Sequence, residues 1–475
     1  MNKFKLFIEN FLVYGLGGII SKIVPLIMVP IVTRLMPNST YYGLSDMSNT
    51  VMNFCIYLSV LGMYDAMYRM FFEKDNVEYK KMVCSTAFIF NLIVSLVVFI
   101  GMLIARRWIA EMFFDNAKYA YLVYLTAMAS LIGGTNSIIS APTRMQNKRK
   151  IFLITNTLGP VLSYAISIPL LLQGHYVIAL PLAGAISGLI LEISFGVMNH
   201  KWFSLRLFDK KLLGQLLKIA LPLFPNFLIY WVFNSCDRIM ITKLIGINHS
   251  GVYSVGAKLG MASQLIYTAF AGGWQFFAFS TMNEDDQVES NTRIFEYLGC
   301  ISFVCTLFIC AVSEPIYHLL FTKTYHGAFI VAPYLFLAPL IQMLFQVASN
   351  QFLVIKKTWP NLLIMVLGAV LNVALNYVLI PTIGIEGASI ATLMGYVLSM
   401  IICVIVLSKM ELFVISKRFI ITTIIFIMLF IAWRLFAVHN TIMIIIMALL
   451  LSGIVTYIYR KDIQRLVKSI NERKK

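Results

Sequence analysis

The chain has 475 residues, of which 60% are hydrophobic and 12% are charged, and its formal net charge is +17 at pH 7. A composition this apolar leaves too little polar surface for a soluble globule, which excludes soluble enzymes and soluble nucleic-acid-binding domains. We expect a polytopic membrane protein without a nucleic-acid partner, in which lysines and arginines report the side of the membrane that each loop occupies.

Apolar runs of about 20 residues recur along the chain, and each is long enough to cross a hydrocarbon core of about 30 Å as a helix. They predict an all-α fold with fourteen transmembrane helices. In chain order the predicted spans cover residues 10–34, 44–68, 82–105, 119–142, 151–172, 177–199, 216–243, 251–281, 294–313, 327–354, 360–380, 386–407, 418–437 and 441–459.

Prolines predict bends in three of these spans, because a proline inside a helix removes a backbone donor and clashes with the preceding turn. The proline pairs are Pro25 and Pro30, Pro222 and Pro225, and Pro333 and Pro339.

The basic residues predict the orientation, because lysine and arginine are retained on the cytoplasmic side of a membrane. With the N-terminus inside, three of the 38 basic residues fall within spans, namely Lys22, Arg238 and Lys258. Seven lie in outer segments: Arg34, Arg106, Arg107, Lys118, Lys243, Lys323 and Arg434. The other 28 are cytoplasmic, so both termini are expected in the cytoplasm and the inner face should attract anionic membrane lipids.

A repeated pattern predicts that the chain contains two copies of a six-helix unit. The segment 33–35 (Thr-Arg-Leu), followed by Tyr42-Gly43, resembles the segment 242–244 (Thr-Lys-Leu), followed by Ser250-Gly251. We therefore expect an N-terminal six-helix lobe at residues 1–200, a C-terminal six-helix lobe at 201–410, and a helix pair with a basic tail at 411–475. Parallel repeats of this kind place a substrate site between the two halves, near the midplane of the membrane.

Several charged residues fall inside the apolar spans, where each ionised side chain costs roughly 2.5 to 3.5 kcal/mol. Such residues must face a protein interior or a water-filled cavity. They are Lys22, Asp65, Glu192, Asp237, Arg238 and Lys258, and Arg69 follows Asp65 by one turn at the cytoplasmic end of its span.

Two lysines give the most specific hypothesis about a binding site. Lys22 and Lys258 lie about half-way along their spans, too deep to reach the interface easily, so we expect them to face a cavity together. Asp65 and Arg69 share a helix face and either neutralise each other or contribute to that cavity. Asp65, Glu192 and Asp237 are candidates for carrying a coupling proton or sodium ion.

Motifs for bond-making chemistry are absent from the sequence. The segment 251–258 (GVYSVGAK) approaches a phosphate-binding loop, but Ala257 precedes the lysine and Leu259 replaces the required serine or threonine. The longest outer loops, near 106–118 and 314–326, are too short for the catalytic domain of a membrane polymerase or glycosyltransferase. We therefore expect a transporter without catalytic residues, metal or cofactor.

Short motifs along the chain give a family resemblance when taken together. They are Pro30-x-x-x-Arg34 with Tyr42-Gly43, Ser235-x-Asp237-Arg238 with Gly251-x-Tyr253, and Asn372-x-x-x-Asn376 with Pro381, Gly384, Gly387-Ala388 and Ala391-Thr392. In their order and spacing the chain resembles the Wzx-type oligosaccharide flippases, polysaccharide transporters of the multidrug/oligosaccharidyl-lipid/polysaccharide (MOP) exporter superfamily. The sequence departs from this pattern in having Lys243 where the first copy has Arg34, and in its few acidic residues.

The resemblance implies two six-helix lobes facing each other in a V, as in the MATE-like fold, and alternating access. It also implies a bacterial cytoplasmic membrane, an undecaprenyl-diphosphate-linked oligosaccharide as substrate, and polysaccharide polymerase machinery as a partner. The candidate substrate-binding residues are then Lys22, Arg34, Asp65, Arg69, Asp237, Arg238 and Lys258. The alternatives are a flippase for a lipid-linked peptidoglycan or teichoic acid precursor, and a multidrug exporter, which would need an anionic cavity.

Overall fold

The computed structural model describes residues 23–260, 262–268, 270, 274, 286–355, 357 and 359–464. Within these residues the regular structure is helical and no strand occurs, which confirms the predicted all-α membrane fold. By their internal contacts the residues form two compact units. Unit 1 comprises Met1–Val255 with Val373–Ala388, and unit 2 comprises Gly256–Asn372 with Ser389–Lys475. The two six-helix lobes predicted from the repeat, and their boundaries, stay a prediction.

Eleven helices in the described part of the chain are long and apolar enough to cross a membrane, or twelve if one bent pair forms a single span. A shorter apolar helix covers Ile23–Leu35. The predicted spans 10–34 and 251–281 run into residues outside the described ranges. The total of fourteen therefore stays a prediction.

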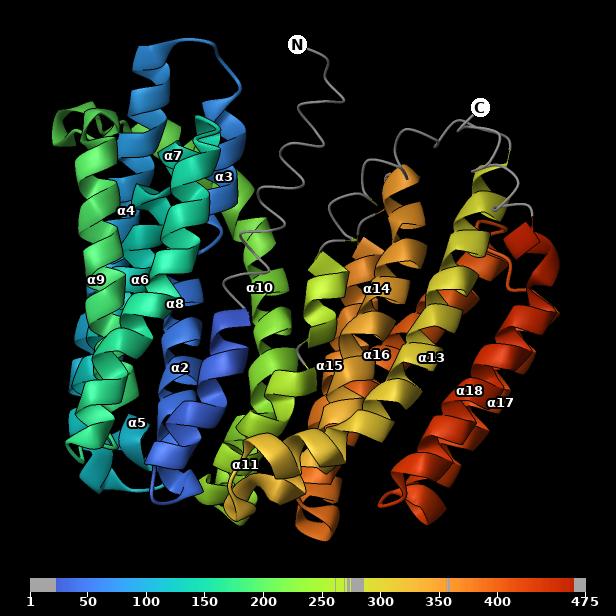
Figure 1. The fold of residues 1–475 in the computed structure, drawn as a ribbon. Helices are drawn as coiled ribbons and strands as arrows, with labels where there is room; N and C mark the ends of the chain where they lie inside the picture. The colour runs from blue at the N-terminus through green and yellow to red at the C-terminus, as the bar shows by residue number, and fades with distance from the viewer. Residues whose placement is uncertain are drawn as a thin grey trace. The chain divides into compact units, whose positions relative to one another are not determined.

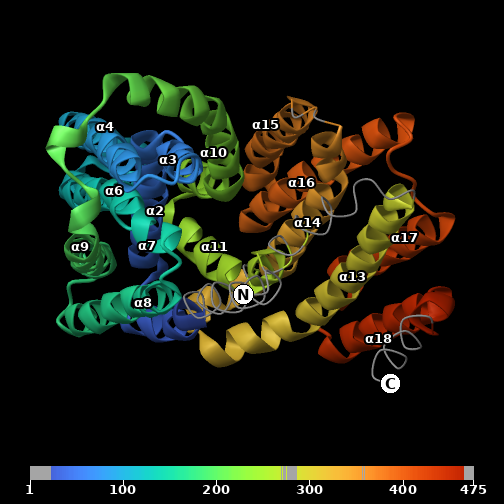
Figure 2. The ribbon, with the colours of Figure 1, turned by 90° about the horizontal axis from the view of Figure 1, so that it is seen from above.

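The helices of unit 1 run along one another and enclose its core (Figures 1 and 2). They are α2 (Ser39–Val60), α3 (Met63–Phe71), α4 (Val77–Ile104), α5 (Arg106–Phe113), α6 (Ala120–Ile139), α7 (Ala141–Met145), α8 (Arg149–Leu172), α9 (Ala179–Asn199), α10 (Lys210–Ile245) and most of α11 (Ile247–Gly260). One buried cluster, which includes Met63, Met67, Val83 and Leu216, joins α3, α4 and α10.

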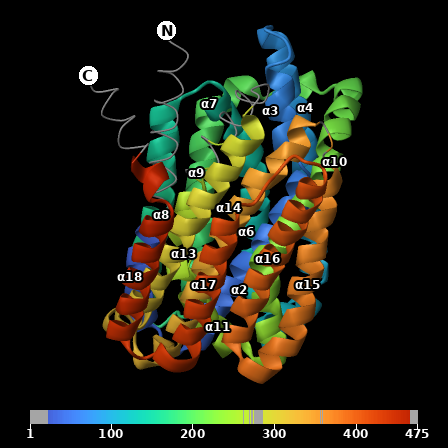
Figure 3. The ribbon, with the colours of Figure 1, turned by 90° about the vertical axis from the view of Figure 1, so that its right-hand side faces the viewer.

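Unit 2 contains the remaining long helices, and Figure 3 shows α13, α17 and α18 side by side. Its helices are α13 (Gln287–Leu320), α14 (Ala332–Val354), the first part of α15 (Trp359–Ile383), most of α16 (Ile385–Lys409), α17 (Lys417–Ala432) and α18 (Thr441–Ile458). Packing is densest around α14, whose side chains are mostly buried.

Polar side chains fix where many of these helices begin. Asn38, Asn76, Asp209, Ser416 and Asn440 each precede a helix, and each accepts a hydrogen bond from a backbone N–H of its first turn. A cap of this kind contributes about 1 kcal/mol by satisfying a donor that has no partner within the helix.

The predicted span 44–68 is interrupted by a sharp break that no proline causes. The chain bends by 46° between α2 and α3. Leu61 and Gly62 form the break with φ angles of 47° and 77°, a left-handed conformation that glycine adopts without strain. A Cβ atom on Gly62 would lie 2.5 Å from the carbonyl oxygen of Ala220, so close contact with α10 also requires glycine here. By contrast, Pro222 and Pro225 do not interrupt α10.

The two longest predicted outer loops contain helical structure. Residues 106–113 form α5, in which Ile109 and Ala110 are buried while Trp108 is 61% exposed. In the other segment, α13 continues to Leu320 and a short helical stretch, η4, covers Lys323–Ile330.

Candidate functional site

Helices α2 and α11 cross at two glycines within unit 1. A Cβ atom on Gly251 would lie 2.0 Å from the carbonyl oxygen of Ser39, and one on Gly43 would lie 2.3 Å from that of Ile247. Cβ atoms do not approach backbone atoms this closely, so the crossing requires glycine at both positions. The repeat predicted from the sequence makes Gly43 and Gly251 equivalent, and the structure places them against each other.

Next to the glycine crossing, a buried ion pair joins α2 to α10. The Nε atom of Arg238 lies 2.6 Å from Oδ2 of Asp46, and the two side chains are 9% and 12% exposed. Ser254 of α11 donates its hydroxyl to the same carboxylate oxygen at 2.6 Å. Arg238 also donates to the carbonyl oxygen of Asn234, one turn earlier on its own helix. Three helices therefore meet at one carboxylate.

Asp237, the neighbour of Arg238, has separate partners. Tyr253 of α11 donates its hydroxyl to Oδ2 of Asp237, and Asn376 of α15 donates an amide N–H to Oδ1 at 3.0 Å. Only 2% of Asp237 is exposed. Adjacent residues on a helix diverge by about 100°, which is why Asp237 and Arg238 turn to different helices.

A second polar region of unit 1 is a cavity of about 430 Å³ near α3 and α7, which lie at the same end of the unit (Figure 1). Its charged lining residues are Asp65 and Arg144. Arg144 donates to the hydroxyl oxygen of Tyr64 at 3.3 Å. The uncharged lining residues include Tyr57, Tyr64, Asn136, Ser137, Thr155, Asn156, Phe152, Phe195 and Phe227.

The structure brings some of the predicted site residues into these regions and leaves others elsewhere. Asp237 and Arg238 belong to the buried network, and Asp65 lines the cavity without Arg69, which is exposed on α3. Glu192 of α9 accepts a hydrogen bond from the hydroxyl of Thr135 at 2.5 Å. Arg34 is exposed at the end of its helix. The substrate and coupling roles of all these residues stay predictions.

The structure does not describe Lys22 and Lys258, the two lysines of the predicted joint site, side by side. Lys258 is half-buried in the part of α11 that belongs to unit 2. Lys22 lies outside the described residues. The predicted joint site of Lys22 and Lys258 therefore stays a prediction.

The sequence reasoning did not assign three residues to the site, namely Asp46, Arg144 and Asn376, although Asn376 belongs to one of the motifs that carry the family resemblance. Asp46 and Arg144 lie close to the ends of predicted spans. An ionised side chain costs little free energy there, so its position does not indicate a functional site. The repeat held a signal for Asp46, because it follows Gly43 by three residues just as Ser254 follows Gly251. Those equivalent positions are hydrogen-bonded to each other in the structure.

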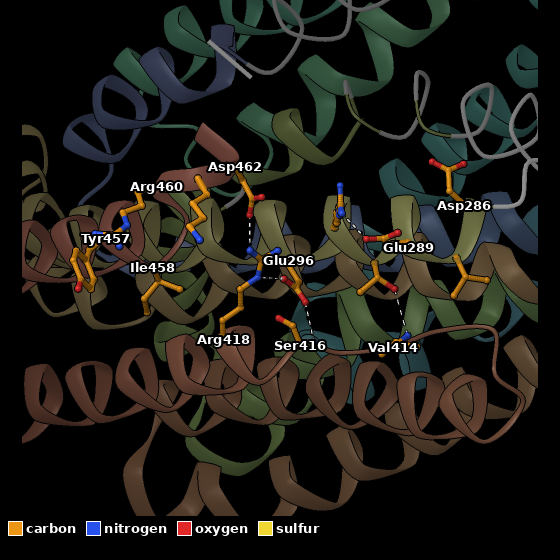
Figure 4. Close-up of a pocket in the computed structure, with 14 residues that line it drawn as sticks. Asp286, Glu289, Glu296, Val414, Ser416, Arg418, Tyr457, Ile458, Arg460 and Asp462 are labelled. Carbon is orange, nitrogen blue, oxygen red and sulfur yellow. Dashed lines mark hydrogen bonds and ion pairs between the residues drawn. The ribbon is translucent and has the colours of Figure 1, made fainter. Parts of the chain in front are cut away.

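Unit 2 contains a larger groove, of about 1080 Å³, between the first turns of α13 and α17 and the end of α18 (Figure 4). Glu296, only 1% exposed, accepts from the backbone N–H of Ser416 at 3.0 Å and from the hydroxyl of Tyr459 at 3.3 Å. Arg418 lies between Glu296, at 3.2 Å, and Asp462, at 2.5 Å. Arg418 therefore pairs with two acids and links α13, α17 and the segment after α18, so we regard the groove as a structural feature.

Many apolar helices long enough to span a membrane define a multi-pass membrane protein, and its helical bundle holds a buried ion pair and a polar cavity. The sequence model of the family described as polysaccharide biosynthesis protein matches residues 31–330, and the chain belongs to that family. In the comparison with curated proteins, no sequence matches.

Solved structures show the same fold at low sequence identity. The lipid II flippase MurJ in an inward closed conformation is similar with a TM-score of 0.72 and 14% identity, over 95% of this chain and 100% of that chain. A multidrug resistance MATE family transporter of the MOP superfamily is similar in its inward-facing conformation, with a TM-score of 0.64, 15% identity and coverage of 83% and 98%. Its outward-facing conformation has a TM-score of 0.57, 15% identity and coverage of 86% and 95%. The chain therefore has the fold of MOP superfamily transporters.

Proposed function

We propose that this protein is a flippase that moves a polyprenyl-diphosphate-linked oligosaccharide across the bacterial cytoplasmic membrane by alternating access, with both termini in the cytoplasm. The observation that carries the proposal is the polar cavity of unit 1, which is lined by Asp65, Arg144, amide side chains and aromatic rings within an apolar membrane protein. Membership of a polysaccharide biosynthesis family supports a glycan-bearing substrate.

The physical problem of such a substrate is its head group. A diphosphate joined to sugars cannot enter hydrocarbon, so the protein must replace its hydration with charged and hydrogen-bonding groups. The polyprenyl tail can remain in the lipid throughout. With the cytoplasm negative, outward movement of about two negative charges gains about 2.3 kcal/mol per charge per 100 mV, so the membrane potential can drive export.

The diphosphate is assigned in this proposal to Lys22 and Lys258, from equivalent helices of the two repeats. Charge-assisted contacts to phosphate contribute about 1.5 to 3 kcal/mol each, so loss of either lysine should weaken binding by roughly one to two decades. Lys22→Ala, Lys258→Ala and the double variant are expressed at matched membrane levels, and export of lipid-linked oligosaccharide is measured. Export by the double variant at the parental rate would overturn the assignment.

Coupling to a proton or sodium ion is proposed for Asp65, Glu192 or Asp237. Transport into vesicles is compared with a proton gradient, a sodium gradient or a membrane potential alone. If the potential alone sustains the full rate in the parental protein and in Asp65→Asn, Glu192→Gln and Asp237→Asn, none of the three acids carries a coupling ion.

A second candidate substrate is a lipid-linked peptidoglycan precursor, which the similarity to a structure titled lipid II flippase favours. Complementation of a strain depleted of its own peptidoglycan-precursor flippase separates the two, because an oligosaccharide flippase should not restore growth. A lipid-linked teichoic acid precursor is distinguished by the same export assay with that lipid. A cationic drug finds less support, because the described lining of the cavity holds an arginine, Arg144, as well as an acid, Asp65.

A further inference from the structure

The charged residues that line the cavity of unit 1 have no net charge. Asp65 and Arg144 are the charged residues among its described lining, and their charges are opposite. A dianionic diphosphate in this cavity would meet as much negative charge as positive charge and would gain little. The cavity is therefore suited to a polar ligand without net charge.

The other lining groups combine flat apolar surfaces with hydrogen-bonding edges. Tyr57 of α2 and Phe227 of α10 stack with ring centroids 5.8 Å apart and an interplanar angle of 14°. Asn136 and Asn156 add side-chain amides, and Ser137 adds a hydroxyl. A sugar ring has the matching surface, since its C–H face packs on aromatic rings while its hydroxyls pair with amides.

Asn136, which lines the cavity, has one buried atom without a partner in the part of the chain that the structure describes. The side-chain oxygen of Asn136 is buried and has no hydrogen-bond partner among the described residues. An acceptor in that state costs free energy unless a ligand or water supplies a donor, and a sugar hydroxyl is such a donor. The volume of about 430 Å³ lies in the range usual for small-ligand sites.

We propose that this cavity binds an uncharged sugar residue of the lipid-linked oligosaccharide, with the diphosphate held outside it. The inference rests on the proposed function and divides the head group between two places: the sugar contacts Asn136, Asn156 and the Tyr57–Phe227 wall, and the charge is neutralised elsewhere. The cavity lies near α3 and α7, next to segments expected in the cytoplasm, so the sugar would be recognised on the loading side.

The test compares two lipids that differ only in the sugar. Purified full-length protein in nanodiscs is titrated with undecaprenyl diphosphate and with the diphosphate-linked oligosaccharide pool extracted from the strain that carries this gene. We expect the parental protein to bind the sugar-bearing lipid about tenfold or more tightly than the bare carrier. Asn136→Ala and Asn156→Ala should remove most of that preference and leave binding of the bare carrier unchanged.

Asn234→Ala is the matched control. Asn234 donates its amide to the carbonyl oxygen of Tyr230, as Asn156 does to that of Phe152, but Asn234 does not line the cavity. The control should keep the full preference for the sugar-bearing lipid. Ser137→Leu fills the cavity without removing an amide, and it should lose the preference even if an amide variant folds poorly. Thermal unfolding of each variant reports its folding.

The outcomes separate the inference from the function on which it rests. If the parental protein prefers the sugar-bearing lipid and all three cavity variants keep that preference, the sugar site is wrong and the flippase function stands. If the parental protein binds both lipids equally, the sugar is not recognised and the inference is also overturned. If it binds neither lipid, the proposed function fails as well.

Discussion

The carboxylate of Asp46 lies 2.6 Å from Nε of Arg238, and this ion pair joins two helices that are far apart in the sequence. Its strength depends on isolation from water, since both side chains are nearly buried. Removal of one partner leaves the other as an uncompensated buried charge, which costs more than the pair itself contributes.

The first prediction follows from that asymmetry. Asp46→Ala and Arg238→Ala should each destabilise the purified protein by about 3 kcal/mol, and the double variant should recover part of the loss. Arg238→Lys should be intermediate, because a lysine keeps the charge without the planar guanidinium geometry. Thermal unfolding of the four variants measures the coupling, and strictly additive losses would show that the two residues act independently.

Substitution of Gly251 tests the helix crossing. The Cβ atom of an alanine would collide with a backbone oxygen at 2.0 Å, which no rotamer change can relieve, so Gly251→Ala should cost about 2 kcal/mol or more. Gly184→Ala is the control, since a Cβ atom on this glycine of α9 meets no described atom within 4 Å. The control should be neutral or gain up to about 1 kcal/mol from helix propensity. Equal melting temperatures for the two variants would refute the close crossing.

Glu296 should hold the C-terminal helix pair in place. Glu296→Gln removes the charge that faces Arg418 and weakens the acceptor for Ser416, so the link between α16 and α17 should become sensitive to protease. Glu289→Gln is the control on the same helix. The ion pair of Glu289 with Arg293 is exposed and should contribute less than about 1 kcal/mol. Limited proteolysis of membranes measures cleavage between residues 409 and 417. Of the two variants, only Glu296→Gln should be cleaved there faster than the parental protein.

The orientation is tested by reporter fusions. A reporter after residue 148 should be active in the cytoplasm, because that segment carries a cluster of lysine and arginine. A fusion after residue 118 should report the outer side. A reporter at residue 148 that is active only outside would invert the proposed topology and the loading side with it.

Sequence reasoning predicted the features that composition and periodicity determine. The spans, the all-helical fold and the burial of Asp237 and Arg238 follow from the cost of polar groups in hydrocarbon, which acts on each segment separately. The family resemblance came from motifs in a fixed order, and the match over residues 31–330 confirms it.

The partners of these residues could not be predicted in the same way. The ion pair of Asp46 with Arg238 and the contact of Asn376 with Asp237 depend on which helices lie together, which local patterns do not encode. The break at Leu61 and Gly62 was missed for a related reason. Glycine there serves a contact with Ala220 of α10, and that contact exists only in the folded chain.

Three contacts along α10 give that helix a mechanical role within unit 1. Arg238 of this helix forms an ion pair with Asp46, and Phe227 stacks on Tyr57 in the cavity wall. Ala220 lies in close contact with Gly62. Pro222 and Pro225 lie between the last two contacts and leave two backbone carbonyls without their usual helical donors. This stretch of α10 is therefore the easiest part of the helix to bend. We therefore expect α10 to bend more easily between Ala220 and Phe227, where the prolines lie, than between Phe227 and Arg238.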